Sequence, residues 1–216
     1  MLVDLTQPVH TGMPVWPGDP EVVLEPAASV AAQGYNLLAL RLGSQTGTHV
    51  DAPYHVDDAL PALGDLPLER FTGRGVVADL RGLPSGTAIT PAHLAPVADR
   101  LGPGTVLLLA TGWSAHWGSP AYAGHPWLHT DAARLVVGAG TLAVGVDAPS
   151  IDPPGATGLP AHHVLARAGA VIVENLTNLD ALLRPPATDG HIQVWLLPLA
   201  LARADGSPIR AVAEIR

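Results

Sequence analysis

Glycine and proline recur along the whole chain, with 23 glycines and 22 prolines among 216 residues. Both residues interrupt regular elements and favour tight turns. Because they are spread through the chain and are not collected in one linker, we expect many short elements and no internal domain boundary. The length suits a single domain spanning residues 1–216 with one substantial core.

The composition excludes several kinds of site and partner. Cysteine is absent, which removes disulfides, thiolate metal sites and cysteine nucleophiles. The formal charge is −8 at pH 7 and the basic residues form no cluster, so we expect no nucleic-acid partner. The apolar runs are too short for a membrane span and the first residues lack a signal pattern, so we expect a cytoplasmic protein without membrane contact.

Short apolar runs bounded by glycine, proline or polar residues predict strands. They cover residues 75–80, 105–112, 141–146, 170–174 and 193–202, and the first 50 residues indicate further strands. Helices are predicted between them over residues 91–101, 130–138 and 160–168, the first two capped by Thr90 and Thr130. Alternating strands and helices predict an α/β fold with a mixed sheet and flanking helices.

The densest group of potential ligands lies between residues 44 and 55. Side chains alternate along an extended segment, so Gln45, His49 and Asp51 would point the same way. A proline at position 53 would end regular strand pairing and let the chain turn His55 back toward them. His49, Asp51 and His55 would then share one small volume.

Two imidazoles and a carboxylate form a nitrogen and oxygen ligand set that suits Zn²⁺, Mn²⁺ or Fe²⁺. Three protein ligands leave coordination positions open for water and substrate, as catalysis requires. Gly47 would keep this face open to a ligand. The alternative interpretation is a set of surface polar residues in a loop.

This segment resembles the HxGTHxDxPxH signature of the cyclase family of metal-dependent hydrolases, which includes bacterial kynurenine formamidases, isatin hydrolases and polyketide cyclases. Other segments resemble the family's N-terminal, central and late glutamate motifs. They are residues 4–6 with 14–19, 145–153 and 174–179. The resemblance covers nearly the whole chain and implies the swivelling β/β/α fold of that family.

The resemblance also implies roles for single residues. His49, Asp51, His162 and Glu174 would be metal ligands, and His55 would be a ligand or the catalytic base. His162 is preferred to its neighbour His163 because it stands twelve residues before Glu174. Independently, Glu174 ends an apolar run in which an unpaired carboxylate would be costly, although a glutamate exposed at a strand end is the alternative.

Gln45 departs from the family pattern, because it stands where the first histidine of the signature usually lies. A neutral amide oxygen coordinates a divalent ion more weakly than an imidazole does. We therefore expect Gln45 to bind the metal weakly or to hold a water bound to it. Whether one ion or two bind, and whether the metal is Zn²⁺ or Mn²⁺, is left open.

Two further sets of residues have alternative interpretations. Asp147 and Asp152 flank a proline-rich turn and either orient ligands or contact substrate, or only bond nearby backbone. The tryptophans at positions 113, 117 and 127 either wall an aromatic pocket or fill the core or a subunit contact. By resemblance, Trp16 is the best candidate for substrate binding.

The expected function is a metal-dependent amidohydrolase in which metal-activated water attacks the carbonyl and His55 transfers the proton. By resemblance, the expected substrate is a small aryl formamide of the N-formylkynurenine type, with a lactam, a lactone or an isatin-like ring as alternatives. A polyketide cyclase and a non-catalytic metal-binding subunit are the competing functions. The resemblance also implies a homodimer or homotetramer.

Overall fold

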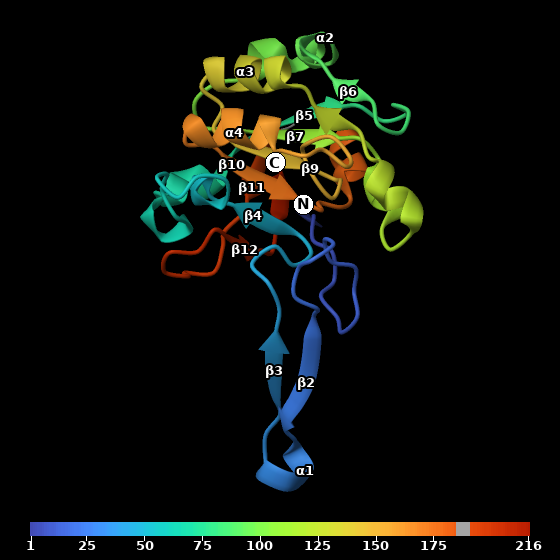
Figure 1. Cartoon of the computed structure of the whole chain (residues 1–216), viewed down its shortest axis with the longest axis vertical. Coiled ribbons are helices and arrows are strands. Elements are labelled where there is room, and N and C mark those ends of the chain that lie inside the picture. Colours follow the sequence, from blue (N-terminus) through green and yellow to red (C-terminus); the bar gives the residue numbers. More distant parts are fainter. Residues whose placement is uncertain (185–190) are drawn as a thin grey trace.

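A mixed sheet of nine strands forms the centre of the computed structural model, which describes residues 1–184 and 191–216 (Figure 1). In spatial order the strands are β1 (Leu2–Asp4), β13 (Val212–Ile215), β11 (Ile192–Trp195), β5 (Thr72–Asp79), β7 (Thr105–Ala110), β9 (Ala143–Val146), β10 (Val171–Glu174), β4 (His49–Asp51) and β12 (Gly206–Pro208). Strands β5, β7, β9 and β10 are parallel, whereas every other neighbouring pair is antiparallel. The predicted mixed α/β sheet is therefore confirmed.

Helices cover one face of this sheet (Figure 1). They are α2 (Pro91–Leu94), which continues as the 3₁₀ helix η4 (Ala95–Arg100), α3 (Thr130–Gly138) and α4 (Pro160–Arg167). The three predicted helices are thus confirmed, the first with a 3₁₀ second half. Thr90 is the N-cap of α2 as predicted, but Thr130 is not a cap, because His129 takes that position and its Nδ1 accepts the backbone N–H of Asp131.

The remaining short elements lie outside the nine-stranded sheet. They are α1 (Val30–Gln33), the 3₁₀ helices η1 (Pro53–His55), η2 (Leu63–Asp65), η3 (Leu68–Phe71), η5 (Trp113–His116), η6 (Pro120–Gly124) and η7 (Leu179–Leu183), and the pairs β2 (Val23–Ala28) with β3 (Leu37–Arg41) and β6 (Ala88–Ile89) with β8 (Trp127–Leu128). The β2–β3 hairpin and α1 form an arm that projects from the body (Figure 1). The strands expected in the first 50 residues are β1 to β4.

Two predicted strands end at least two residues earlier than expected. The run 193–202 ends as a strand at Trp195, and beyond it Pro198 makes only a single bridge to Ile209, because a proline has no N–H for a ladder. The run 105–112 ends at Ala110 because the backbone N–H groups of Thr111 and Gly112 donate to the side chain of Asp147 instead.

The core has two layers, one on each face of the sheet. Every residue of β7 is buried, since its side chains point alternately toward the helices and toward the opposite layer. Leu107 lies in the same core layer as Val136 of α3 and Leu165 of α4, whereas Leu108 lies in the opposite layer with Val50. Burial on both faces fixes the central strands, and β10 and β4 beside them carry the predicted ligands.

Within the part of the chain that the structure describes, no helix combines the length and apolar character needed to cross a membrane.

Candidate active site

The register between β10 and β4 brings three predicted ligands together. Glu174 lies directly opposite His49 in this antiparallel pair, and Asp51 points to the same face because it is two residues beyond His49. His49 Nε2 lies 3.5 Å from Asp51 Oδ1 and 3.7 Å from Glu174 Oε2. The local spacing and the strand pairing together build one side of the cluster.

Helix α4 supplies the second imidazole. His162 Nε2 lies 3.5 Å from Asp51 Oδ2 and 3.4 Å from Glu174 Oε1. His49, Asp51, His162 and Glu174 are all buried, with at most 6% of any residue exposed. The structure therefore brings four of the predicted metal ligands together, and it is His162, preferred over His163, that lies in the cluster.

Hydrogen bonds behind the rings fix which imidazole nitrogen faces the carboxylates. His49 Nδ1 donates to the Gly47 carbonyl at 2.8 Å, and His162 Nδ1 donates to Asp152 Oδ2 at 2.6 Å. With Nδ1 protonated in each neutral ring, both Nε2 atoms present lone pairs to the cluster. This is how histidines are held when they bind a metal.

The cluster fits a divalent cation. Neither oxygen of the Asp51 carboxylate has a hydrogen-bond partner among the described residues, although Asp51 is only 2% exposed. An unsatisfied buried carboxylate is costly, and a cation bound by two imidazoles and two carboxylates would satisfy it.

The pKa directions agree with a site that favours positive charge. Burial opposes charge on His162, but its bond to Asp152 and the nearby Asp51 and Glu174 raise its pKa to about 10. Burial likewise opposes charge on Asp51, yet the imidazoles of His49 and His162 lower its pKa. The raised pKa of His162 favours a proton on its imidazole when no metal is bound, and a bound cation would replace that proton.

His55 lies at the edge of this cluster. It ends the 3₁₀ helix η1, so the turn expected after Pro53 is present. Single ligand atoms of Asp51, His55 and His162 lie within 4.8 Å of one another, while His55 Nδ1 lies 3.3 Å from Asp205 Oδ2. Since its side chain is 27% exposed, His55 can reach both the cluster and a bound substrate.

Gln45 is arranged differently from the expectation. Regular strand pairing begins only at His49, because Gly47 has a left-handed φ of 59°, so Gln45 lies in the preceding turn. Its Nε2 donates to Asp205 Oδ2 at 3.0 Å and lies 3.4 Å from His55 Nδ1. The amide nitrogen, and not the oxygen, therefore faces these two groups.

Two acidic residues near the cluster were missed from the sequence. Asp205 contacts both His55 and Gln45, but in the sequence its Asp–Gly pair indicates only a turn. Asp19 lies close enough for His49 and His55 to affect its pKa, which burial raises. Its place in the N-terminal motif was the available signal.

The structure separates the roles of the two aspartates in the proline-rich turn. Asp147 accepts from the backbone N–H groups of Thr111 at 2.9 Å and Gly112 at 2.8 Å, so it is a turn residue. Asp152 orients His162 and also accepts the backbone N–H of Ala161 at 2.6 Å. The ligand-orienting interpretation therefore holds for Asp152 and not for Asp147.

The four tryptophans singled out in the sequence have different surroundings. Trp113 donates its Nε1 hydrogen to the Tyr122 carbonyl at 3.0 Å and packs against the core, and Trp127 donates to the Gly86 carbonyl at 2.9 Å. Trp117 packs edge-on against Tyr122. Trp16 is 48% exposed in the N-terminal loop that leads to Asp19.

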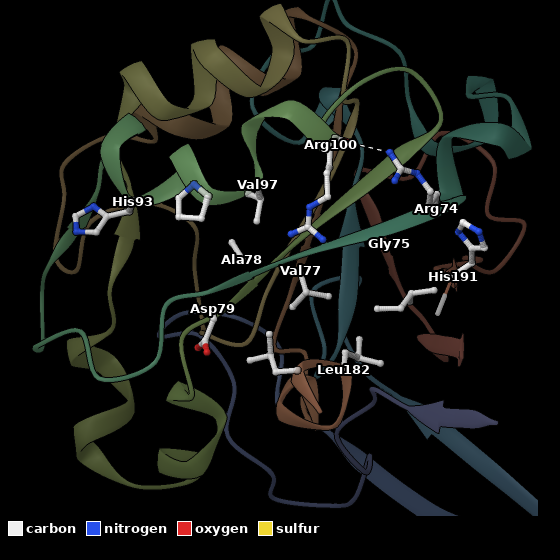
Figure 2. A pocket seen from close by; sticks show the side chains of 13 residues that line it. Arg74, Gly75, Val77, Ala78, Asp79, His93, Val97, Arg100, Leu182 and His191 are labelled. Carbon is white, nitrogen blue, oxygen red and sulfur yellow. Dashed lines mark hydrogen bonds between the residues drawn. The ribbon is translucent and has the colours of Figure 1, made fainter. Parts of the chain in front are cut away.

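A separate cavity of about 530 Å³ opens beside β5 (Figure 2). Arg74, Arg100, His93 and His191 line it together with apolar residues such as Leu182. None of the predicted site residues lines this cavity, and β5 is separated from β4 by three strands of the sheet. The cluster of predicted metal ligands therefore lies in a different part of the fold from this cavity.

Sequence comparisons identify the family. The family model called Cyclase matches residues 3–153. The kynurenine formamidase of Bordetella petrii is 36% identical over 217 aligned residues, covering 98% of this chain and 96% of that protein. The chain belongs to the cyclase family. A second relative of this family, the kynurenine formamidase of Salinibacter ruber, is 34% identical and covers 98% of this chain and 96% of its own length.

Solved structures share the fold of this chain. Isatin hydrolase A from Labrenzia aggregata shares the fold with a TM-score of 0.86 at 24% identity, covering 99% of this chain and 93% of that chain. A structure described as a potential metal-dependent hydrolase with cyclase activity has a TM-score of 0.77 at 25% identity, covering 99% of this chain and 96% of that chain. This cyclase-family chain is accordingly an amidohydrolase enzyme, with a buried cluster that can hold a metal ion.

Proposed function

We propose that this cyclase-family protein uses Zn²⁺ or Mn²⁺ to hydrolyse the C–N bond of an aryl formamide of the N-formylkynurenine type. The observation that carries the metal-dependent chemistry is the buried Asp51 carboxylate, whose two oxygens lack partners among the described residues and face two imidazoles. The substrate class follows from relatives 34–36% identical over nearly the whole chain, which are named kynurenine formamidases.

Four buried side chains would hold the ion: His49 and His162 through Nε2, and Asp51 and Glu174 through carboxylate oxygens. A bound divalent cation supplies Lewis acidity, which acidifies water and polarises a carbonyl. The polar groups around the cluster keep these ligands in place, since Ile151 N–H donates to Glu174 Oε1 at 2.8 Å. Gln45 is proposed to hold a water or to contact the ion weakly.

His55 is proposed as the residue that moves the proton. Its Nδ1 faces Asp205 at 3.3 Å, which leaves Nε2 as the atom available to take a proton from water. The imidazolium formed in this way would be stabilised by the Asp205 carboxylate. It can then return the proton to the departing nitrogen as the C–N bond breaks.

Trp16 is proposed to contact the aromatic part of the substrate. It stands in the same turn as Asp19, whose N–H donates to the Trp16 carbonyl at 3.0 Å, and Asp19 lies near His49 and His55. A half-exposed indole in this turn offers a flat apolar surface to an aryl ring.

The direct test is to assay the purified protein with N-formylkynurenine and with isatin, while measuring its metal content by elemental analysis. We expect formamide hydrolysis that is lost on chelation and restored by Zn²⁺ or Mn²⁺. Asp51→Asn should lose both metal and activity. If the protein preferred isatin, the substrate would be a lactam and not a formamide. If the metal-bound protein only closed a polyketide ring, the function would be that of a cyclase. Absence of metal at micromolar supply would favour a non-catalytic subunit.

We further propose that the protein self-associates through its arm. The arm exposes large apolar side chains, namely Val30, Tyr35, Leu37, Leu38 and Leu40. Such a patch is typical of an interface. Light scattering should give at least a dimer, and Leu38→Ser with Leu40→Ser should shift the protein toward monomer; a monomeric native chain would contradict this.

A further inference from the structure

Asn175, which follows the ligand Glu174 directly, has an unusual backbone. Its φ is 58°, in the left-handed region that residues other than glycine rarely adopt, and it is only 8% exposed. A buried side chain persists in this conformation only when its surroundings hold it there. Asparagine tolerates the conformation better than most residues.

Every polar group of Asn175 has a partner, and the partners come from separate segments. Its backbone N–H donates to the Ala148 carbonyl at 2.9 Å, and its carbonyl accepts from Thr48 Oγ1 at 2.6 Å. Its side-chain Nδ2 donates to the Gly47 carbonyl at 2.9 Å, and its Oδ1 accepts from the Tyr122 hydroxyl at 2.8 Å. Asn175 therefore connects the turn before β4 to the turn after β9 and to the loop that contains η6.

The Gly47 carbonyl has two donors. Besides Asn175 Nδ2 it accepts the Nδ1 hydrogen of His49 at 2.8 Å. Gly47 has a left-handed φ of 59°, and a Cβ at this position would lie 3.1 Å from Met13 Cε. The direction of this carbonyl is thus set by the glycine conformation and by Asn175, and it in turn sets the direction of the His49 ring.

We infer that Asn175 is a positioning residue for His49: its amide fixes the Gly47 carbonyl, which holds the imidazole with Nε2 toward Asp51 and Glu174. This inference rests on the proposed metal-dependent function. Partners of metal-binding histidines commonly change metal affinity by 10-fold to 100-fold when they are removed. Here the partner acts one hydrogen bond further back, through a backbone carbonyl.

Tyr122 holds the other end of the Asn175 amide. The Gly47 carbonyl can only accept, so Nδ2 faces Gly47, and the tyrosine hydroxyl donates to Oδ1. Trp113 Nε1 in turn donates to the Tyr122 carbonyl, which ties the tryptophan-rich loop to this arrangement. Tyr122→Phe should therefore act in the same direction as loss of the Asn175 side chain, but more weakly.

The test compares Asn175→Gly with Asn178→Gly. Asn178 has the same left-handed conformation, with φ 57°, but its Nδ2 donates to the Asp4 carbonyl on the surface. Glycine accepts this backbone conformation without strain in both variants, so the comparison isolates the side-chain bonds. Calorimetric titration of the chelated proteins with Zn²⁺ and with Mn²⁺ should give a dissociation constant raised roughly 10-fold to 100-fold in Asn175→Gly. The value should be unchanged in Asn178→Gly and raised several-fold in Tyr122→Phe.

A second readout is the His49 tautomer in metal-free protein, followed by ¹⁵N NMR of labelled histidine. The native chain should show the Nδ1-protonated ring, and Asn175→Gly should show a mixture of tautomers. Native affinity and a native tautomer in Asn175→Gly would overturn the inference. If the native chain binds no metal, the proposed function fails, and the tautomer alone then decides whether Asn175 orients His49. If Asn175→Gly does not fold, Tyr122→Phe decides in the same two measurements.

Discussion

The Asp152 carboxylate accepts the Nδ1 hydrogen of His162 at 2.6 Å and at the same time caps the helix that carries this histidine. Its oxygens also accept the backbone N–H groups of Ala161 at 2.6 Å and of His162 at 3.1 Å, both in the first turn of α4. Asp152 is 1% exposed, so these charge-assisted bonds lie outside solvent. One side chain therefore fixes both where α4 begins and which way its imidazole points.

Asp152→Asn should weaken metal binding and stability together. The amide can replace only part of the carboxylate's acceptor capacity, so at least one buried N–H loses its charged partner, at a cost of about 1.5–3 kcal/mol in the free energy of unfolding. The imidazole also loses the anion that orients it, and the metal dissociation constant should rise about 10-fold to 100-fold. Denaturant unfolding and calorimetric metal titration measure the two effects.

Asp147→Asn is the matched control for this substitution. Asp147 is also a buried aspartate and accepts the backbone N–H groups of Thr111 and Gly112. It does not belong to the cluster of predicted metal ligands. We expect Asp147→Asn to lose stability and to keep native metal affinity. Equal loss of affinity in both variants would mean that Asp152 acts only through the stability of the fold.

Metal-free protein should become less stable as pH rises between about 6.5 and 10. Burial opposes charge on His162, but Asp152, Asp51 and Glu174 raise its pKa from 6.5 to about 10, so the folded state keeps a proton that the unfolded chain releases over this range. The stabilisation is complete below pH 6.5 and is lost as pH rises through the folded pKa. Chelated protein unfolded by denaturant at several pH values should give this slope, and His162→Gln should flatten it.

Metal binding should show the opposite dependence on pH. A cation that binds His162 Nε2 must displace this proton, so affinity should rise by about tenfold per pH unit while His162 is protonated in the free protein. Calorimetry in two buffers of different protonation enthalpy would measure the released proton. A metal affinity that does not change between pH 6.5 and 9 would contradict the assignment of His162 as a ligand.

The sequence predicted the central strands well because their signal is local. Residues of β7 and β10 are buried on both faces, so they form uninterrupted apolar runs. The leucine-rich run after Trp195 looked the same, yet Leu197 and Leu199 are exposed. Whether an apolar run forms a strand depends on a partner strand, and beyond Trp195 this run makes only the single bridge from Pro198 to Ile209.

Local sequence signals likewise predict only part of the candidate site. His49 and Asp51 were recognised from their spacing on one strand, whereas His162 needed the family resemblance because only the packing of α4 brings it to β4. Asp205 had no comparable signal: it reaches His55 because β12 pairs with β4 and Gly206 lies opposite Asp51. A Cβ at Gly206 would lie 2.6 Å from Gln45 Nε2, which explains this glycine only after the fold is known.

His55→Ala should separate metal binding from catalysis. Its imidazole is at the edge of the cluster, so we expect metal affinity close to that of the native chain and a loss of roughly 10²-fold or more in kcat, typical of losing a general base. Asp205→Asn should give a smaller loss of kcat, because the imidazole is kept but its anionic partner is removed. Stopped-flow assays and elemental analysis of the same samples test this. Full activity in His55→Ala would end its assignment as the base, and loss of metal would make it a ligand.

Gln45→His should increase metal content in protein purified without added metal. An imidazole binds Zn²⁺ or Mn²⁺ more tightly than an amide oxygen does, and the new ring would stand beside His55 and Asp205, where Gln45 Nε2 now lies. Because the substitution also removes the amide bond to Asp205, Gln45→Ala is needed as a companion that loses the bond without adding a ligand. We expect elemental analysis to give more metal per chain in Gln45→His than in the native chain, and less or equal metal in Gln45→Ala. Equal metal content and equal activity in all three proteins would show that position 45 neither binds the ion nor holds its water.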